Sequence, residues 1–151
     1  RNIDMTAIVV NNSIYGMTGG QYSPMTPFGK RATTATCGTI DHAFDLVELA
    51  KGAGASFVAR TTTFHPKEMI KMFSKAIKHK GFSVVEVLSQ CPTYYGRKNE
   101  IGNAVDMMQG YKEGTVKIGS KKKEENPELI ERGVFVQEER PEYSSSCPLS
   151  E

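Results

Sequence analysis

Three strand-like runs separated by helix-like segments fill the first 90 residues, and this order most constrains the fold. The runs are residues 3–10, 56–60 and 82–88, and each is rich in β-branched or aromatic residues and bounded by polar or glycine-containing segments. Runs of this kind are typical of buried strands. The order strand, helix, strand, helix, strand predicts an α/β fold, in which a parallel sheet with right-handed crossovers carries flanking helices.

Two helices are expected between these strands. Thr39 or Asp41 is predicted to cap the first, which runs to about Lys51. Its apolar face is expected to comprise Ala43, Leu46, Val47 and Ala50. The second is predicted over residues 68–80, after Pro66 at a favourable first position and before Gly81. Its buried face is expected to comprise Met69, Ile70, Phe73 and Ile77.

The later third of the chain contains weaker signals. We expect a helix over residues 102–112, an extended segment over 114–119, a helical turn over 128–132 and a short strand over 134–136. The charged segment that starts at Lys121 is expected to be solvated. One domain is predicted over residues 1–143, with an extension from about residue 114, and residues 144–151 are expected to form a flexible tail.

Composition narrows the class of protein. At 38% hydrophobic and 24% charged residues the chain resembles an ordinary globular protein, and its net charge of +2 gives no argument for a nucleic-acid partner. No apolar run approaches the roughly 20 residues that cross a membrane, and no leader pattern is present, so we expect no membrane and a cytoplasmic location. Three widely spaced cysteines fit a reducing compartment.

A polar, glycine-rich loop follows the first strand-like run. Asn11 and Asn12 fall at its carboxyl end, where open α/β sheets bind ligands. An Asn amide oxygen is a neutral, hard donor that suits Mg²⁺ beside a diphosphate. Gly16, Gly19 and Gly20 permit positive φ and close backbone approach. Taken alone, these residues favour an ordinary Asn/Gly turn over a cofactor loop.

A longer comparison of motifs favours the cofactor loop. Residues 11–26, NNSIYGMTGGQYSPMT, resemble the corresponding loop in the β subunits of 2-oxoacid:ferredoxin oxidoreductases. Residues 87–99, VLSQCPTYYGRKN, resemble the same family, most closely its 2-oxoglutarate-specific members. The resemblance extends to about residue 143 but covers only the later half of such a subunit. It implies part of a thiamine diphosphate-binding fold.

The resemblance also implies roles for the loop residues. Asn12 is then a side-chain Mg²⁺ ligand, and Ile14 supplies its backbone carbonyl. The residues that match the segment around the diphosphate are Gly16, Met17, Thr18, Gly19 and Gly20. Met17 falls where the family varies its substrate-side contact, although flexible packing is an equal alternative for a methionine.

Cys91 lies in the Cys-Pro-Thr sequence, where related subunits place the last of four iron-sulfur ligands. A lone buried cysteine is otherwise usually inert. The resemblance therefore implies a 4Fe-4S cluster that is completed by cysteines upstream of this chain. Cys37 and Cys147 match neither the order nor the spacing of cluster ligands and are assigned to structure or chance.

The activity that the resemblance implies is oxidative decarboxylation of 2-oxoglutarate to succinyl-CoA, with electrons passed to ferredoxin. An α subunit and small γ and δ subunits are the implied partners, and pyruvate or a branched-chain 2-oxoacid is an alternative substrate. The family's Gly-Asp-Gly and Cys-x-x-Cys motifs do not occur here, so a catalytically incompetent fragment or interaction module is a second hypothesis. His65 is a further candidate for positioning substrate or cofactor, and its alternative is a helix cap or surface residue. Arg97 and Lys98 are candidates for attracting a substrate carboxylate or a CoA phosphate, and their alternative is solvated loop charge.

Overall fold

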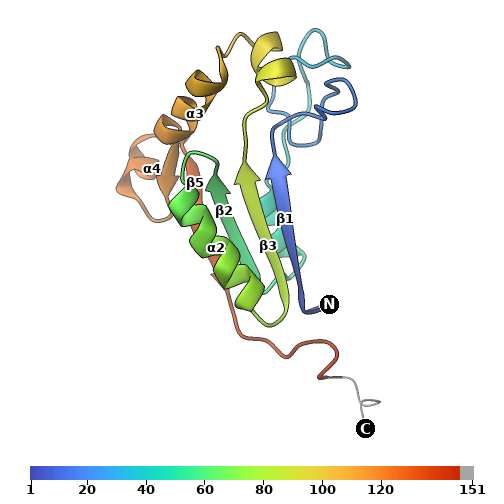
Figure 1. The fold of residues 1–151 in the computed structure, drawn as a ribbon, viewed down its shortest axis with the longest axis vertical. Helices are drawn as coiled ribbons and strands as arrows, with labels where there is room; N and C mark the ends of the chain where they lie inside the picture. Colours follow the sequence, from blue (N-terminus) through green and yellow to red (C-terminus); the bar gives the residue numbers. More distant parts are fainter. Residues whose placement is uncertain (147–151) are drawn as a thin grey trace.

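The computed structural model describes residues 1–146, which form a five-stranded sheet with helices on both faces (Figure 1). The strands lie in the order β1-β3-β2-β5-β4. Their bounds are Met5–Asn11 for β1, Phe57–Thr62 for β2, Phe82–Leu88 for β3, Thr115–Lys117 for β4 and Ile130–Gln137 for β5. β3 pairs in parallel with both β1 and β2. The predicted α/β fold with flanking helices is confirmed, and the sheet, which was predicted to be parallel, is mostly parallel.

β5 is the exception to the parallel arrangement, because it pairs antiparallel to β2. The register joins Phe57 to Gln137 and Arg60 to Gly133. The start of β5 therefore lies near the carboxyl end of β2, and β5 runs back along that strand. β4 pairs in parallel with β5 and completes the sheet.

Helices α1 (Leu46–Gly52) and α2 (Pro66–Lys78) cover opposite faces of the sheet. Alternate strand residues face each helix because successive side chains of a strand point to opposite faces. The core on the α1 face comprises Val47, Ala50, Ala55, Val58 and Val84. The core on the α2 face comprises Phe57, Ala59, Met72, Ala76 and Val85.

Both predicted helices occur, but their details differ. α1 begins after Asp45, whose carboxylate accepts hydrogen bonds from the backbone N–H groups of Val47 and Glu48. The predicted caps Thr39 and Asp41 are wrong, since no helix forms before Leu46 and Ala43 is exposed. A charged cap with two backbone donors fixes the helix start more firmly than the upstream apolar residues do.

α2 begins at Pro66 as predicted, but its predicted buried face is partly wrong. Met72 and Ala76 are buried, whereas Ile70 and Ile77 are exposed. Glu68 forms an ion pair with Arg132 of β5 and faces that side of the helix. Ile70 and Ile77 therefore lie on a flank of α2 that the described residues 1–146 leave exposed.

β1 was predicted to be a buried strand, and this is wrong for the described residues 1–146. β1 lies at the edge of the sheet, and Met5, Ile8 and Val10 are 53%, 43% and 64% exposed. Its β-branched sequence specifies a strand, but burial depends on neighbours that only tertiary structure supplies. β1 and α2 therefore both carry uncovered apolar side chains.

The later third of the chain begins with α3 (Ala104–Glu113). A capping box between Asn103 and Asp106 marks the start of this helix. The expected helix over 102–112 and extended segment over 114–119 are thus confirmed. The expected helical turn over 128–132 is wrong, because β5 begins at Ile130, and the helix near there is α4 (Lys121–Glu125). Cys147 and most of the predicted tail lie outside the described residues.

No helix of the described part is long and apolar enough to span a membrane.

Candidate functional site

The candidate site lies at the carboxyl edge of the parallel strands. β1, β2 and β3 end together there, beside the loop over residues 12–44 and the π-helical turn Pro92–Gly96 (Figure 1). Asn11 is the last residue of β1, and its carbonyl accepts a hydrogen bond from the backbone N–H of Ser89. A Cβ placed on Gly16 would lie 3.5 Å from Cys91 Sγ and 3.7 Å from Asn12 Nδ2. The loop and Cys91 thus share one edge of the sheet.

Asn12 and Ile14 carry the oxygens that were predicted to bind Mg²⁺. Asn12 Oδ1 accepts a hydrogen bond from the Ile14 N–H over 3.3 Å, and the Ile14 carbonyl accepts one from the Gly16 N–H over 3.1 Å. Each oxygen has two lone pairs, so each keeps one for a cation. Neutral oxygen donors at a half-buried turn fit Mg²⁺ chemistry.

The glycine-rich loop forms a tight turn that closes on itself. Tyr15 N–H donates to the Gln21 carbonyl over 2.9 Å, and Gly20 N–H donates to the Tyr15 carbonyl over 2.9 Å. Gly19 and Gly20 have φ of +118° and +84°, a region that favours glycine. Thr18 and Gln21 hydrogen-bond to each other across the turn.

Met17 lies at the tip of this turn and is fully exposed. Packing within residues 1–146 therefore does not explain its position, and the packing alternative is not supported. A ligand or another polypeptide that approached the loop would meet Met17 first. Its role as a substrate-side contact stays a prediction.

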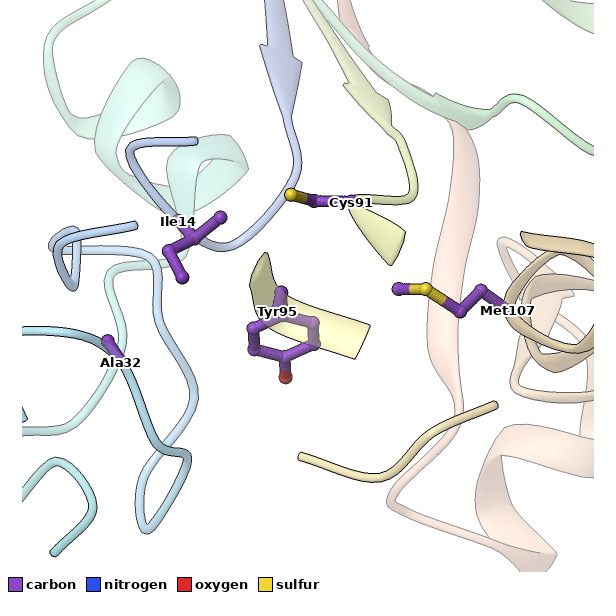
Figure 2. Close-up of a cluster of buried hydrophobic side chains, with 5 residues drawn as sticks. All are labelled: Ile14, Ala32, Cys91, Tyr95 and Met107. Atoms are coloured by element: carbon purple, nitrogen blue, oxygen red, sulfur yellow. The ribbon is translucent and has the colours of Figure 1, made fainter. Parts of the chain in front are cut away.

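Cys91 is buried beneath the loop, and its sulfur points toward Ile14 (Figure 2). The surrounding cluster comprises Ile14, Ala32, Tyr95 and Met107. Burial raises the pKa of Tyr95 to about 12, so this phenol is neutral at physiological pH. Cys91 precedes the Pro92–Gly96 turn, whose Gly96 N–H donates to the Cys91 carbonyl over 2.9 Å. The backbone on both sides of Cys91 is therefore fixed.

A buried ionic network, which was not predicted from the sequence, contacts the start of the loop through Asn11. Glu86 of β3 is 2% exposed and accepts hydrogen bonds from Arg60 Nε of β2 over 2.6 Å and from Asn11 Nδ2 over 2.7 Å. Arg60 Nη2 also donates to Asp45 Oδ1 over 2.5 Å. Burial lowers the pKa of Arg60, but Glu86 and Asp45 more than offset this effect and leave it raised. The sequence signal for this network is one charged residue in each of two largely apolar strands, Arg60 in β2 and Glu86 in β3, with opposite charges.

Residues 1–87 match the family model described as thiamine pyrophosphate enzyme, C-terminal TPP binding domain. The matched region contains β1, β2, all but the last residue of β3, both flanking helices and the candidate loop. The chain belongs to this thiamine pyrophosphate enzyme family.

Curated relatives of this thiamine pyrophosphate enzyme domain agree with the motif comparison. The chain is 49% identical over 146 residues to 2-oxoglutarate synthase subunit KorB of Methanocaldococcus jannaschii, covering 95% of this chain and 54% of that protein. It is 40% identical over 94 residues to 2-oxoacid:ferredoxin oxidoreductase subunit beta of Saccharolobus solfataricus, covering 62% of this chain and 31% of that protein. The chain thus spans about half the length, or less, of these relatives.

A solved structure shows the same fold. It is the 2-oxoglutarate:ferredoxin oxidoreductase from Magnetococcus marinus, solved with 2-oxoglutarate, coenzyme A and succinyl-CoA bound. The TM-score is 0.79 at 25% identity, and the match covers 93% of this chain and 50% of that one. These matches confirm the predicted resemblance to the β subunits of 2-oxoacid:ferredoxin oxidoreductases.

The remaining candidates of this thiamine pyrophosphate enzyme domain lie around the same edge. His65 precedes α2, and its Nδ1 hydrogen-bonds to Thr62 Oγ1 over 2.8 Å. Burial and nearby Arg132 lower the pKa of His65, so the neutral ring is favoured at physiological pH. Arg97 is exposed and Lys98 half-buried just beyond the Pro92–Gly96 turn. Their predicted contacts with substrate or CoA stay predictions.

The other two histidines, His42 and His79, contact neighbouring side chains. His42 lies in the loop before α1 and stacks on the ring of Phe28. His79 ends α2, and its Nε2 hydrogen-bonds to the buried Ser56 over 2.8 Å. Both positions are structural.

Within residues 1–146, no group of three or more His, Cys, Asp or Glu side chains lies close enough to hold a metal ion. The predicted role of Cys91 as one ligand of an iron-sulfur cluster stays a prediction. Cys37 is exposed and lies apart from it.

Proposed function

We propose that residues 1–143 form the later half of a β-subunit domain in a 2-oxoglutarate:ferredoxin oxidoreductase. The observation that carries this proposal is the 49% identity to a 2-oxoglutarate synthase subunit along nearly the whole chain. The joint placement of Asn12, Gly16 and Cys91 at one sheet edge supports it. The enzyme converts 2-oxoglutarate and CoA to succinyl-CoA and carbon dioxide, and ferredoxin accepts the electrons.

The loop would hold thiamine diphosphate through Mg²⁺. Asn12 Oδ1 and the Ile14 carbonyl are the proposed Mg²⁺ ligands, and residues 16–20 border the diphosphate. Bound thiamine diphosphate supplies the carbanion chemistry that decarboxylation of a 2-oxoacid requires. The chain's own contribution is to orient the oxygen donors and, through the fully exposed Met17, to meet the substrate side of the site.

Cys91 would supply one thiolate to an iron-sulfur cluster whose other ligands lie outside this chain. Its buried, apolar surroundings exclude water from the sulfur, which favours a structured cluster ligand over a surface thiol. The short separation between Cys91 Sγ and Gly16 brings the proposed cluster close to the proposed cofactor. Electrons released by decarboxylation then leave through this side of the domain.

The proposed partners are an α subunit, small γ and δ subunits, and ferredoxin. Arg97 and Lys98 are proposed to attract the 2-oxoacid carboxylate or a CoA phosphate, because guanidinium and ammonium groups pair with both. The relative named only for 2-oxoacids keeps pyruvate and branched-chain 2-oxoacids as alternative substrates.

The test is a steady-state comparison in the assembled enzyme. The rates of CoA-dependent reduction of ferredoxin or methyl viologen are measured with 2-oxoglutarate, pyruvate and a branched-chain 2-oxoacid. The proposal expects the highest kcat/KM for 2-oxoglutarate. A preference for pyruvate would refute the substrate assignment, and no CoA-dependent activity with any of them would refute the enzyme class.

A second hypothesis is a catalytically incompetent interaction module. Its motivation is that the Gly-Asp-Gly and Cys-x-x-Cys motifs do not occur among these 151 residues. Calorimetry with thiamine diphosphate and Mg²⁺, together with iron analysis after anaerobic purification, separates the two. Tight cofactor binding with a stable cluster would reject the module.

A further inference from the structure

We propose that the buried Arg60–Glu86 pair positions the Mg²⁺-binding loop by orienting the amide of Asn11. The inference rests on the proposed function, since it assumes that the loop holds the cofactor. Glu86 stands on β3, between β1 and β2, and each of its carboxylate oxygens serves a different neighbour. Oε2 accepts from Arg60 over 2.6 Å, and Oε1 accepts from Asn11 Nδ2 over 2.7 Å.

The chemistry of the pair decides which way the Asn11 amide points. A carboxylate that is paired with a guanidinium offers only acceptors to Asn11. The amide nitrogen of Asn11 must therefore face Glu86, which leaves Oδ1 to face the loop. There it accepts the backbone N–H of Ser13 over 3.0 Å.

Ser13 is the position where this orientation matters. Its φ is +62°, in the left-handed region, which costs a non-glycine residue about 1 kcal/mol or more. Two hydrogen bonds hold it there: Asn11 Oδ1 accepts its N–H, and Thr26 Oγ1 donates to its carbonyl over 2.6 Å. Ser13 lies between Asn12 and Ile14, so this turn sets the directions in which Asn12 Oδ1 and the Ile14 carbonyl oxygen point.

Stability alone gives a poor reason for the pair. Burying two charges costs several kcal/mol of solvation, and apolar side chains of similar size often serve as well or better. The same face of the sheet is otherwise packed with apolar residues such as Val58 and Val84. Arg60 is also held from its other side by Asp45, the cap of α1. A continuous chain of hydrogen bonds, the Asn11 relay, therefore runs from the cap of α1 through β2 and β3 to the loop. Its members are Asp45, Arg60, Glu86, Asn11 and Ser13.

The test measures Mg²⁺ affinity by calorimetry, in the presence of thiamine diphosphate, on the assembled enzyme stripped of cofactor. In Glu86→Gln the side-chain oxygen faces Arg60, so the new NH₂ group faces Asn11. The Asn11 amide must then turn, and its nitrogen opposes the Ser13 N–H. We expect Mg²⁺ affinity to fall by roughly tenfold, the equivalent of one hydrogen bond.

A polarity swap supplies the specific signature. Asn11→Asp alone places a second carboxylate against Glu86 and is expected to weaken Mg²⁺ binding. In the double variant Glu86→Gln/Asn11→Asp, the carboxylate introduced at position 11 accepts from both the amide introduced at position 86 and the N–H of Ser13. We expect recovery to within roughly threefold of wild-type affinity. A purely structural role for the ion pair would produce no such recovery.

Glu68→Gln is the matched control, because it disrupts the ion pair between α2 and β5 without touching the Asn11 relay. It is expected to lower the Tm and to leave Mg²⁺ affinity unchanged. Wild-type affinity in Glu86→Gln, or weak binding in both single variants without recovery in the double, would overturn the inference.

Asn11→Ala serves if Glu86→Gln does not assemble, since it keeps the ion pair and removes only its link to the loop. Unchanged Mg²⁺ affinity in that variant would also overturn the inference. Failure of the wild-type enzyme to bind thiamine diphosphate and Mg²⁺ would instead refute the proposed function. The two failures are therefore distinguishable.

Discussion

The ring of Tyr94 packs directly against the backbone of Gly20. A Cβ at position 20 would lie 2.5 Å from Tyr94 Cδ1, and the φ of Gly20 is +84°. We expect Gly20→Ala to lower the free energy of unfolding by roughly 3 kcal/mol, from strain and overpacking together, as measured by chemical denaturation. Gly29→Ala is the control, because Gly29 has φ +74° with open space around it. Equal losses in the two variants would show that Tyr94 does not restrict position 20.

Asn12→Ala removes one proposed oxygen ligand. We expect Mg²⁺ affinity in the assembled enzyme to fall by about tenfold or more, measured by calorimetry with thiamine diphosphate present. Asn126→Ala is a matched control, since Asn126 Oδ1 accepts the Glu128 N–H in the same type of turn, away from the site. Unchanged Mg²⁺ affinity in Asn12→Ala would reject Asn12 as a ligand.

Cys91→Ser tests the proposed cluster ligand. We expect lower iron content and slower ferredoxin reduction, with thiamine diphosphate affinity changed by less than about threefold, because a serine hydroxyl is a poor substitute for a thiolate. Iron analysis and electron paramagnetic resonance after anaerobic purification supply the measurement. Cys37→Ser, at an exposed thiol, should behave as wild type. Normal iron content in Cys91→Ser would contradict the assignment.

Asp45→Asn tests the acidic cap of α1. Burial raises the pKa of Asp45, but Arg60 and the backbone N–H donors more than offset this effect and leave it lowered. A lowered folded-state pKa contributes stability above the unfolded value of about 3.9, and this contribution is lost as pH falls through the folded value. Asn keeps the cap but not the charge. We expect a lower Tm for Asp45→Asn at pH 7 and a difference that shrinks below about pH 4. A difference independent of pH would exclude the charge effect.

Local signals in the sequence predicted the elements with strong boundaries. Pro66 marks the start of α2, and Asn11 and Asn12 were placed correctly at the carboxyl end of β1. These features depend on nearby residues and on the geometry of parallel strands, which a sequence displays directly. The fold class followed from the alternation of strand-like and helix-like segments in the first 90 residues.

The burial of side chains and the pairing of residues across strands were harder to predict from the sequence. The exposure of Ile8 on β1 and of Ile70 on α2 depends on which surfaces the rest of the fold covers. The relay between Arg60 and Glu86 arises because two strands far apart in sequence become neighbours in register. A single charged residue in an apolar run does not identify its partner until the strand order is known.

β3 supports both halves of the proposed site, with Glu86 near its end and Cys91 three residues beyond the strand. A shift of one residue in its pairing would turn Glu86 to the other face of the sheet and displace Cys91 by about 3.3 Å. Substitutions that loosen this strand should therefore remove cofactor binding and electron transfer together. In a screen of random variants, positions of β3 would be enriched among those that lose both properties at once.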